Sequence, residues 1–308
     1  MVPPVAAVDI GGTKTLVEVF DVSSGGEGPV GSRELPTARS GDLVEGLAET
    51  IRRVANGREI EAVGVGCPGP LDPREGVILN PPNLSRGWWE LRLADGLASR
   101  LGVPASLEND CNLGALGEWA SGTGKGYGSV LYVTVSTGVG AGLVSGGEIF
   151  GGNRGFALEL GHTTVETDGP VCGCGRSGCV EALASGTAIA RRARELGWTP
   201  DTGETGSREV AAAAEKGDRL ALRALQEAAS YLGKSLVNFI YSFDPGVVVL
   251  GGGVARSGLF VGLVREAIER EPVMPAFLGV PVVRAGLPGR SVIHGARSLA
   301  ERLARAGS

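Results

Sequence analysis

Short apolar runs alternate with longer segments in which apolar residues recur every three or four positions. The runs predict strands at residues 5–9, 15–21, 60–66, 105–108, 129–136, 141–145, 246–250 and 280–284. At residues 42–55, Leu43, Leu47 and Ile51 fall on one helical face. The same spacing predicts helices at residues 90–101, 111–120, 180–196, 218–243 and 291–306. Strands alternating with helices predict an α/β fold.

Two predicted strand pairs share one pattern: an apolar strand, a Thr/Gly turn and a second strand. The first pair turns at residues 11–14 (GGTK), and the second turns at residues 137–140 (TGVG). Backbone N–H groups in such turns can bind phosphate. The repeat suggests a duplicated fold that grips one phosphate chain from both sides. Asp9 ends the first strand, where an acid could hold the hydrated Mg²⁺ of a nucleotide. An ordinary hairpin with a surface aspartate is the alternative.

Three other segments carry candidate chemistry. Residues 80–89 (NPPNLSRGWW) form an irregular stretch whose amide and indole groups suit either sugar recognition or a cover over the core. Residues 251–253, three glycines after an apolar run, let the backbone approach a flat ligand or its ribose. Asp110 follows Asn109 at a strand-to-helix corner. It could be a plain helix cap or a general base.

The segment at residues 159–181 concentrates cysteine and histidine. His162, Cys172, Cys174 and Cys179 have the spacing H-x9-C-x-C-x4-C, which is compatible with a tetrahedral Cys3His zinc site. A disulfide and three unligated thiols are the alternatives. Four protein ligands leave no open position for a catalytic water, so such a zinc ion would be structural.

Composition narrows the function classes. The chain has 308 residues, a net charge of −5 and 43% hydrophobic residues, which describes a globular protein that can build two cores. The acidic balance argues against a nucleic-acid-binding surface. The sequence contains no apolar run of membrane-spanning length, and its first residues do not resemble a signal peptide. These features predict a cytoplasmic protein without membrane contact, whose reduced thiols are available for metal.

Taken together, these motifs resemble the ROK family, named for its repressors, open reading frames and sugar kinases. The matching segments are DIGGTK at residues 9–14, ENDCNLGALGE at 108–118, STGVGAG at 136–142, ELGH at 159–162 and CGCGRSGCVE at 172–181. The resemblance implies an actin-like, ribonuclease H-like kinase fold of two α/β lobes with a cleft between them. It places residues 1–118 in the N-terminal lobe and residues 119–308 in the C-terminal lobe. The last helix, at about residues 291–306, is expected to pack back on the N-terminal lobe.

The resemblance also implies a role for each site residue. Asp110 would be the base that takes the proton of the sugar hydroxyl. The nucleotide, ATP with Mg²⁺, would meet Asp9, Gly11, Gly12, Thr13, Lys14, Thr137, Gly138, Gly251, Gly252 and Gly253. The sugar would meet Gly69, Asn83, Asn109, Asp110, Glu159, His162 and Glu181. Structural Zn²⁺ would be held by His162, Cys172, Cys174 and Cys179.

The implied activity is phosphoryl transfer from ATP to the 6-hydroxyl of a hexose, with glucose as first choice. An N-acetylmannosamine or other N-acetylhexosamine kinase and a fructokinase are alternatives, and polyphosphate is an alternative donor. A sugar-responsive regulator without catalysis is a remote alternative, because the first phosphate turn begins near residue 9 and leaves no room ahead of it for a helix-turn-helix. A homodimer or homotetramer is expected.

Overall fold

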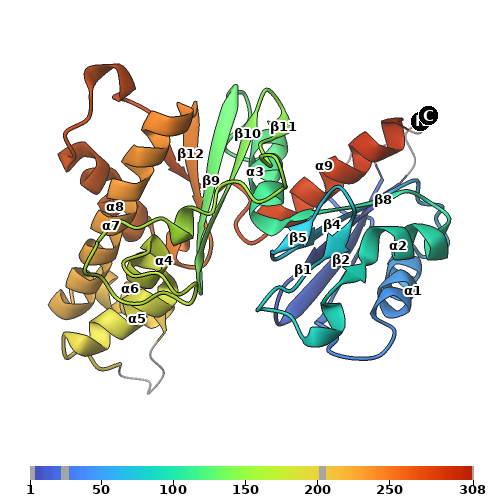
Figure 1. Ribbon diagram of the computed structural model, residues 1–308, viewed down its shortest axis with the longest axis horizontal. Coiled ribbons are helices and arrows are strands. Elements are labelled where there is room, and N and C mark those ends of the chain that lie inside the picture. The colour runs from blue at the N-terminus through green and yellow to red at the C-terminus, as the bar shows by residue number, and fades with distance from the viewer. Residues whose placement is uncertain (1–3, 22–27, 201–205, 307–308) are drawn as a thin grey trace. The chain divides into compact units, whose positions relative to one another are not determined.

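The computed structural model describes residues 4–21, 28–200 and 206–306, and the chain divides into two compact units. The first unit comprises Met1–Ser121, Glu148–Ala157 and Arg290–Ser308. The second comprises Gly122–Gly147 and Leu158–Gly289. Figure 1 labels the α-helices and many of the strands of both units.

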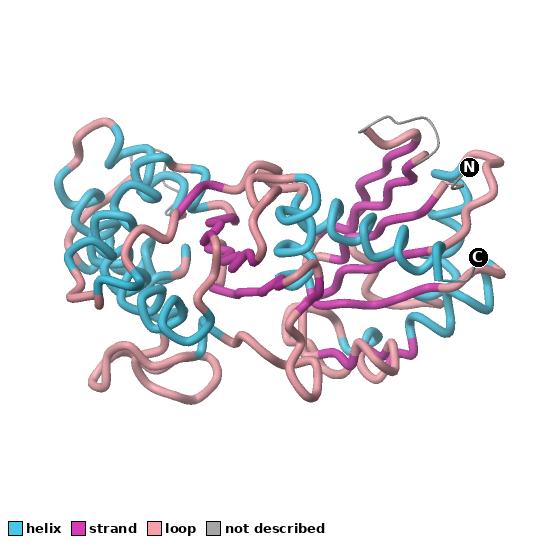
Figure 2. The backbone as a smooth tube through the Cα atoms, turned by 90° about the horizontal axis from the view of Figure 1, so that it is seen from above, coloured by secondary structure: helices cyan, strands magenta, loops and turns pink. Residues whose placement is uncertain are grey.

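The first unit is built on a five-stranded sheet with the strand order β3-β2-β1-β4-β8. These strands are β1 (Val5–Ile10), β2 (Lys14–Phe20), β3 (Gly31–Pro36), β4 (Val63–Cys67) and β8 (Ala105–Asn109). A small sheet beside it contains β5 (Leu71–Asp72), β6 (Val77–Ile78) and β7 (Leu91–Arg92), and β11 (Glu148–Ile149) also falls in this unit. Its helices are α1 (Leu43–Ala55), η1 (Arg86–Trp88), α2 (Leu93–Leu101), α3 (Asp110–Ser121) and α9 (Ser291–Ala306). Figure 2 shows the strands of the main sheet running side by side.

The two faces of this sheet are covered differently. Val63 and Val65 of β4 belong to a hydrophobic core that includes apolar residues of α1 and α2. Gly64, between them, points to the other face, where a Cβ would collide with the backbone of α9. Helix α9 therefore lies directly on the sheet, and it also packs against α3. The last helix of the sequence thus completes the core of the unit that contains the first strand.

The second unit repeats this arrangement. Its neighbouring strands run β10-β9-β12-β13, in which β9 (Ser129–Val135) and β10 (Val139–Ser145) form the hairpin, and β12 (Val247–Gly251) and β13 (Val282–Arg284) pair in parallel. Its helices are η2 (Leu160–His162), α4 (Val180–Ala184), α5 (Gly186–Glu195), α6 (Ser207–Glu215), α7 (Arg219–Phe243), η3 (Val254–Arg256), α8 (Gly258–Arg270) and η4 (Pro275–Phe277). The order β10-β9-β12-β13 matches β2-β1-β4-β8, as the repeated hairpin pattern of the sequence suggested.

Several predicted elements differ from the observed ones. The helix predicted at residues 90–101 begins at Leu93, because residues 91–92 form β7. The helix predicted at residues 180–196 is interrupted at Ser185, whose hydroxyl accepts the N–H of Ala188 and so caps α5. Strand β3 and helix α6 were not predicted. Strand β3 is mostly polar, and α6 is a short alanine-rich segment, so both give weaker signals than the apolar runs.

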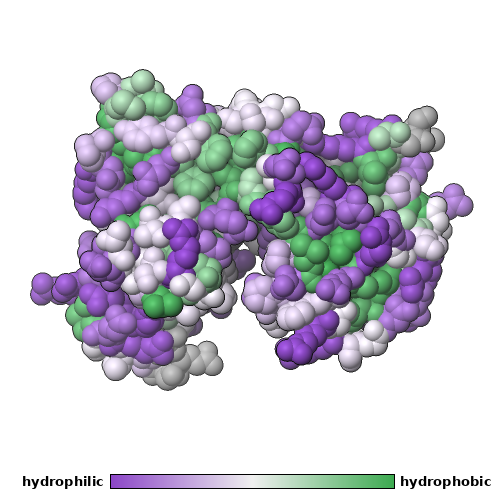
Figure 3. All heavy atoms as spheres, viewed as in Figure 1, coloured by the Kyte–Doolittle hydropathy of each residue, from purple (hydrophilic) through white to green (hydrophobic). Residues whose placement is uncertain are grey.

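The surface carries both kinds of side chain. In Figure 3, hydrophilic residues are spread over the visible face, with hydrophobic patches between them. Within the described residues, none of the helices combines the length and the apolarity that crossing a bilayer requires.

Candidate active site and metal centre

The carboxyl ends of three parallel strands bring polar groups together in the first unit. In the register, Asp9 of β1 lies opposite Gly66 of β4, and Cys67 lies opposite Asn109 of β8. Asp110 follows at once as the first residue of α3. Ligand sites of α/β proteins form at such strand ends. Asp9, Asn109 and Asp110, which the sequence separates by a hundred residues, therefore share one edge of one sheet.

The Asp9 carboxyl is partly buried, and its burial raises the pKa from 3.8 to about 7, with the nearby charge of Asp110 adding to the effect. Burial also raises the pKa of the Cys67 thiol well above its usual range, and both aspartates contribute. The carboxyl groups of Asp9 and Asp110 and the thiol of Cys67 thus lie close together at a partly buried site. A cation beside Asp9 would favour its ionised form, which fits an acid that binds a divalent metal ion.

Asp110 is not the cap of α3. The side-chain oxygen of Asn109 accepts the N–H groups of Cys111 and Asn112, at 2.9 and 3.3 Å, as an N-cap residue does. The Asp110 Oδ1 also accepts the N–H of Cys111, at 2.8 Å. Asn109 therefore acts as the N-cap of α3, the role that the sequence had offered as an alternative for Asp110.

Glu108 was missed by the sequence interpretation. Its Oε1 accepts the Asn109 N–H at 2.7 Å and the Asn112 side-chain N–H at 3.0 Å, so it fixes the strand-to-helix corner. Burial raises the pKa of Glu108. An acid near the end of a predicted strand, four residues before an asparagine, was the available signal.

The first glycine turn is held by backbone and hydroxyl contacts. The N–H of Gly11 donates to the Lys14 carbonyl at 2.9 Å, and the Thr37 hydroxyl donates to the Gly11 carbonyl at 2.7 Å. Gly12 and Thr13 are exposed. The Lys14 ammonium pairs with Glu34 at 2.6 Å on the surface. The hydrogen bonds at Gly11 thus hold the turn, and its exposed residues are accessible to an anion.

Two other predicted residues lie close to these groups. A Cβ on Gly12 would come within 2.8 Å of the Asn83 carbonyl oxygen, and a Cβ on Gly69 would lie 3.4 Å from the Asn109 side-chain nitrogen. In the loop that holds Asn83, Trp88 is buried and donates to the Ala38 carbonyl, whereas Trp89 is 39% exposed. Trp88 therefore covers the core, and Asn83 remains the exposed sugar candidate.

The strand ends of the second unit bring its two glycine segments together. Gly251 of β12 lies opposite Thr134 of β9, just before the turn at residues 136–138. A Cβ on Gly252 would collide with the Val135 carbonyl, and its φ of +86° is also one that glycine adopts readily. The predicted adenosine segment, residues 251–253, therefore lies beside the predicted phosphate turn of the same unit. Ser136 and Thr137 of that turn are exposed.

The cysteine and histidine side chains form one cluster. The ligand atoms of His162, Cys172, Cys174 and Cys179 all lie within 4.8 Å of one another. The Cys174 and Cys179 sulfurs are 3.7 Å apart, and the Cys172 sulfur is 3.6 Å from His162 Nδ1. Zinc bond lengths of about 2.3 Å to sulfur and about 2.0–2.1 Å to nitrogen put tetrahedral ligands roughly 3.5–3.8 Å apart. The five cysteines form no disulfide in the structure, and the cluster has the dimensions of a tetrahedral metal site.

The thiol acidities in this cluster differ. Burial raises the pKa of Cys172 and Cys179, whereas the backbone N–H of Arg176 lowers the pKa of Cys174. Metal ligation requires thiolates, so binding would release protons from the two buried thiols. Because Nδ1 of His162 faces the Cys172 sulfur, Nε2 is the ring nitrogen that can form a hydrogen bond with another group.

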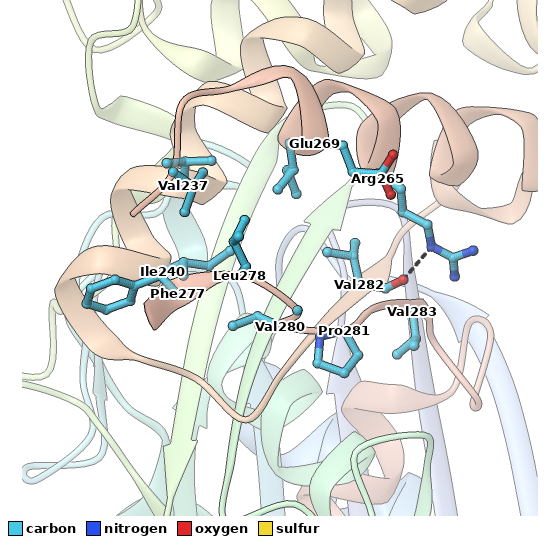
Figure 4. Close-up of a pocket in the computed structure, with 13 residues that line it drawn as sticks. Val237, Ile240, Arg265, Glu269, Phe277, Leu278, Val280, Pro281, Val282 and Val283 are labelled. Atoms are coloured by element: carbon cyan, nitrogen blue, oxygen red, sulfur yellow. Dashed lines mark hydrogen bonds between the residues drawn. The ribbon is translucent and has the colours of Figure 1, made fainter. Parts of the chain in front are cut away.

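The second unit also contains a cavity of about 390 Å³ between α7, α8 and β13 (Figure 4). Ile240, Leu278 and Val280 contribute to its mainly apolar lining, and Arg265 donates from Nε to the Val282 carbonyl at 2.6 Å. Among the described residues that line it, none is a predicted site residue. The cavity is therefore separate from the candidate site.

The repeated strand order, with polar residues at the strand ends, defines a class of protein: an α/β protein with the actin-like, ribonuclease H-like fold of sugar kinases. The sequence matches the ROK family over residues 5–302, and the chain belongs to this family. The resemblance seen in the motifs is thus confirmed.

Individual relatives agree with this assignment. The chain is 37% identical to a glucokinase of Thermotoga maritima, over 84% of each chain. It is similar to the crystal structure of a ROK hexokinase from Thermus thermophilus, with 39% identity, a TM-score of 0.86 and coverage of 99% of this chain and 100% of the other. A ROK glucokinase from Streptomyces griseus, in complex with glucose and AMPPNP, has 31% identity and a TM-score of 0.83, with coverage of 97% and 99%.

Proposed function

We propose that the protein is an ATP-dependent hexose kinase that phosphorylates the 6-hydroxyl of its sugar, with glucose as the first substrate. The observation that carries the proposal is the pair of carboxylates, Asp9 and Asp110, at the carboxyl edge of one sheet beside a glycine turn. Phosphoryl transfer requires charge neutralisation and a carboxylate near the attacking hydroxyl, and this edge can supply both. The relatives described above, a hexokinase and two glucokinases, support the same activity.

Asp110 is the general base in this proposal. It accepts the proton of the sugar 6-hydroxyl while that oxygen bonds to the γ-phosphorus and the bond from phosphorus to the ADP oxygen breaks. Asp9 would hold the nucleotide's Mg²⁺, which would supply positive charge to neutralise the phosphates. Glu108 and Asn109 fix the corner from which Asp110 projects.

The remaining residues hold the two substrates. The nucleotide is bound by Gly11, Gly12, Thr13, Lys14, Thr137, Gly138, Gly251, Gly252 and Gly253. The sugar hydroxyls are bound by Gly69, Asn83, Asn109, Glu159, His162 and Glu181. Zn²⁺ is the metal that suits the Cys3His cluster, where it orders the loop. The proposed lobes are residues 1–118 and 119–308, with the helix at 291–306 belonging to the first. The two compact units differ from these bounds, because residues 119–121 and 148–157 also fall in the first unit.

A coupled assay of ADP release tests the function. Glucose, mannose, fructose, N-acetylglucosamine and N-acetylmannosamine are offered with Mg²⁺ and either ATP or polyphosphate. Sugar-dependent ADP release with glucose, and a product that carries phosphate at the 6-position, are expected. Turnover of N-acetylmannosamine in preference to glucose would move the assignment to an N-acetylhexosamine kinase. No sugar-dependent release across the panel would refute the proposal.

Assembly and location belong to the same proposal. A ROK kinase of this kind is expected to be a cytoplasmic homodimer or homotetramer without affinity for nucleic acid. Light scattering of the purified protein distinguishes the two assemblies from a monomer.

A further inference from the structure

Glu181 contacts two features of the second unit at once. Its Oε2 accepts the N–H of Val139 at 3.1 Å, immediately after the turn at residues 136–138. Its Oε1 is 3.8 Å from the sulfur of Cys172, a member of the metal cluster. A Cβ on Gly138 would collide with the same carboxylate, so Glu181 lies directly against the turn. One side chain therefore joins the phosphate turn to the metal cluster.

The helices that follow the cluster reinforce this link. The N–H of Gly186 donates to the Ser136 carbonyl at 2.7 Å, and the Thr187 hydroxyl donates to the Thr137 carbonyl at 2.9 Å. Both donors begin α5, which follows α4 after one residue. The first two residues of α5 thus bind the Ser136 and Thr137 carbonyls of the turn, while Glu181 accepts the N–H that follows it.

The metal cluster fixes the other end of the same segment. Cys179 directly precedes α4, and the N–H of Val180 donates to the Thr163 carbonyl, next to His162, at 3.0 Å. Gly161 packs so closely on Val139 that a Cβ there would overlap the Val139 carbonyl. Two of the three chain segments that supply metal ligands, at residues 160–163 and 179–181, therefore touch the turn or carry a residue that does.

We propose that Glu181 is a positioning residue through which occupancy of the metal cluster sets the geometry of the phosphate turn. The inference rests on the proposed function, because its ligand is the nucleoside triphosphate of that reaction. It extends the role of Glu181 beyond contact with sugar. In a filled cluster Cys172 is a thiolate and does not donate to Glu181. The metal instead holds Cys179, and with it the start of α4, the helix that carries Glu181, and so keeps the carboxylate on the Val139 N–H. Loss of the metal loosens both, and the affinity for nucleotide falls even when sugar is absent.

Amide hydrogen exchange at Val139 and calorimetry with AMPPNP, both without sugar, test the role of Glu181. In Glu181→Ala the Val139 N–H loses its charged acceptor, so we expect exchange about tenfold faster or more, and AMPPNP affinity weaker by about the same factor. Glu181→Gln keeps a side-chain oxygen that can accept this bond, and should recover most of both effects. A residue that contacts only sugar would change neither measurement.

Two internal controls separate this effect from general loosening. Glu166 lies on the same loop but contacts Gly169 and Gly178 through its backbone, so Glu166→Ala should leave Val139 exchange unchanged. The amide of Val144, near the other end of β10, should exchange at the parent rate in every variant. Parental exchange at Val139 in Glu181→Ala would overturn the proposal.

The metal arm uses Cys174→Ser and chelation of the parent protein. Elemental analysis should show loss of zinc, together with faster exchange at Val139 and weaker AMPPNP binding. In a Glu181→Ala background, removal of the metal should add little, because the connecting side chain is already absent. Loss of zinc with parental Val139 exchange and AMPPNP affinity would refute the coupling. If the parent protein itself binds no AMPPNP, the proposed function is refuted. The exchange rate at Val139 still tests whether Glu181 connects the metal cluster to the turn.

Discussion

At the residue scale, capping of α3 and general-base chemistry belong to different residues, Asn109 and Asp110, although the sequence allows Asp110 to do either. Asn109 accepts two N–H groups of the first turn of α3, so it is the cap. Asp110 bonds one of the same N–H groups, at 2.8 Å, a bond that an asparagine oxygen can also make. Changing its charge should therefore disturb chemistry much more than folding.

We expect Asp110→Asn to fold with a free energy of unfolding within about 1 kcal/mol of the parent. Turnover should fall on the order of 10²–10⁴-fold, because the base that accepts the hydroxyl proton is lost. Sugar affinity, measured by calorimetry, should change much less. Asp218→Asn is the matched control, since Asp218 caps α7 by accepting two N–H groups and should not affect turnover. Near-parental turnover in Asp110→Asn would remove the catalytic assignment.

The raised pKa of Asp9 predicts a pH-dependent stability. The carboxyl has a pKa of about 7 in the folded protein and 3.8 as its ordinary value, so the folded state binds the proton more tightly. Its contribution is fully favourable below about pH 3.8 and is lost as the pH rises through 7. In metal-free buffer, Asp9→Asn should be more stable than the parent at pH 8, by up to about 4 kcal/mol, and equally stable near pH 4.

Urea unfolding between pH 4 and 8.5, with a chelator present, measures this difference. Asp95→Asn serves as the control, because Asp95 is exposed and pairs with Arg92 at the surface, where ion pairs contribute little. A constant difference between parent and Asp9→Asn across the range would show that Asp9 has an ordinary pKa.

At the element scale, periodicity predicted the elements whose sequence pattern is strong. The two hairpins and helix α9 follow from apolar runs and helical spacing alone, and α9 matches its predicted bounds, Ser291–Ala306. The break at Ser185 was not predictable from spacing, because the apolar pattern continues across it. Two contacts accompany the break: Ser185 caps α5 through the Ala188 N–H, and the Gly186 N–H donates to the Ser136 carbonyl, a residue 50 positions earlier in the chain.

The candidate site shows the same limit. Glycine and aspartate at strand ends could be recognised from the sequence, because turn residues stand out after apolar runs. Trp88 and Trp89 are adjacent and chemically identical, yet one is buried in the core and the other is exposed. Glu181 was recognised as a sugar candidate, but its bond to Val139 joins residues 42 positions apart and has no local signal.

The metal loop should be coupled to sugar binding through His162. Its Nδ1 faces the Cys172 sulfur, so a bound metal would fix the ring and leave the other nitrogen as an N–H donor toward a sugar hydroxyl. We expect Cys174→Ser to lose zinc and to bind sugar at least tenfold more weakly, while the cores of both units stay folded. Elemental analysis, calorimetry with glucose and circular dichroism measure the three quantities. Tight sugar binding without zinc would contradict the coupling.

At the scale of the whole molecule, the chain returns to the unit in which it began. Arg290 pairs with the buried Glu18 of β2, and the Ser291 hydroxyl donates to the buried Glu118 of α3 at 2.7 Å. From there α9 lies on β1 and β4. The carboxyl-terminal helix is therefore an integral part of the first core, and this unit folds only when distant parts of the sequence meet.

The contact between α3 and α9 is made by backbone, and this gives a specific prediction. A Cβ on Gly117 would overlap the Ser291 carbonyl and lie 2.8 Å from the Gly295 nitrogen. Ala is the better helix former by about 1 kcal/mol, yet Gly117→Ala should destabilise the protein by about 1–3 kcal/mol, because the helices must separate. Gly46→Ala in α1 is the matched control: a Cβ there meets nothing within 4 Å, so it should stabilise by about 0.5–1 kcal/mol. Urea unfolding gives both values, and opposite signs are expected. Stabilisation of both variants would show that α9 is not in close contact with α3 in solution.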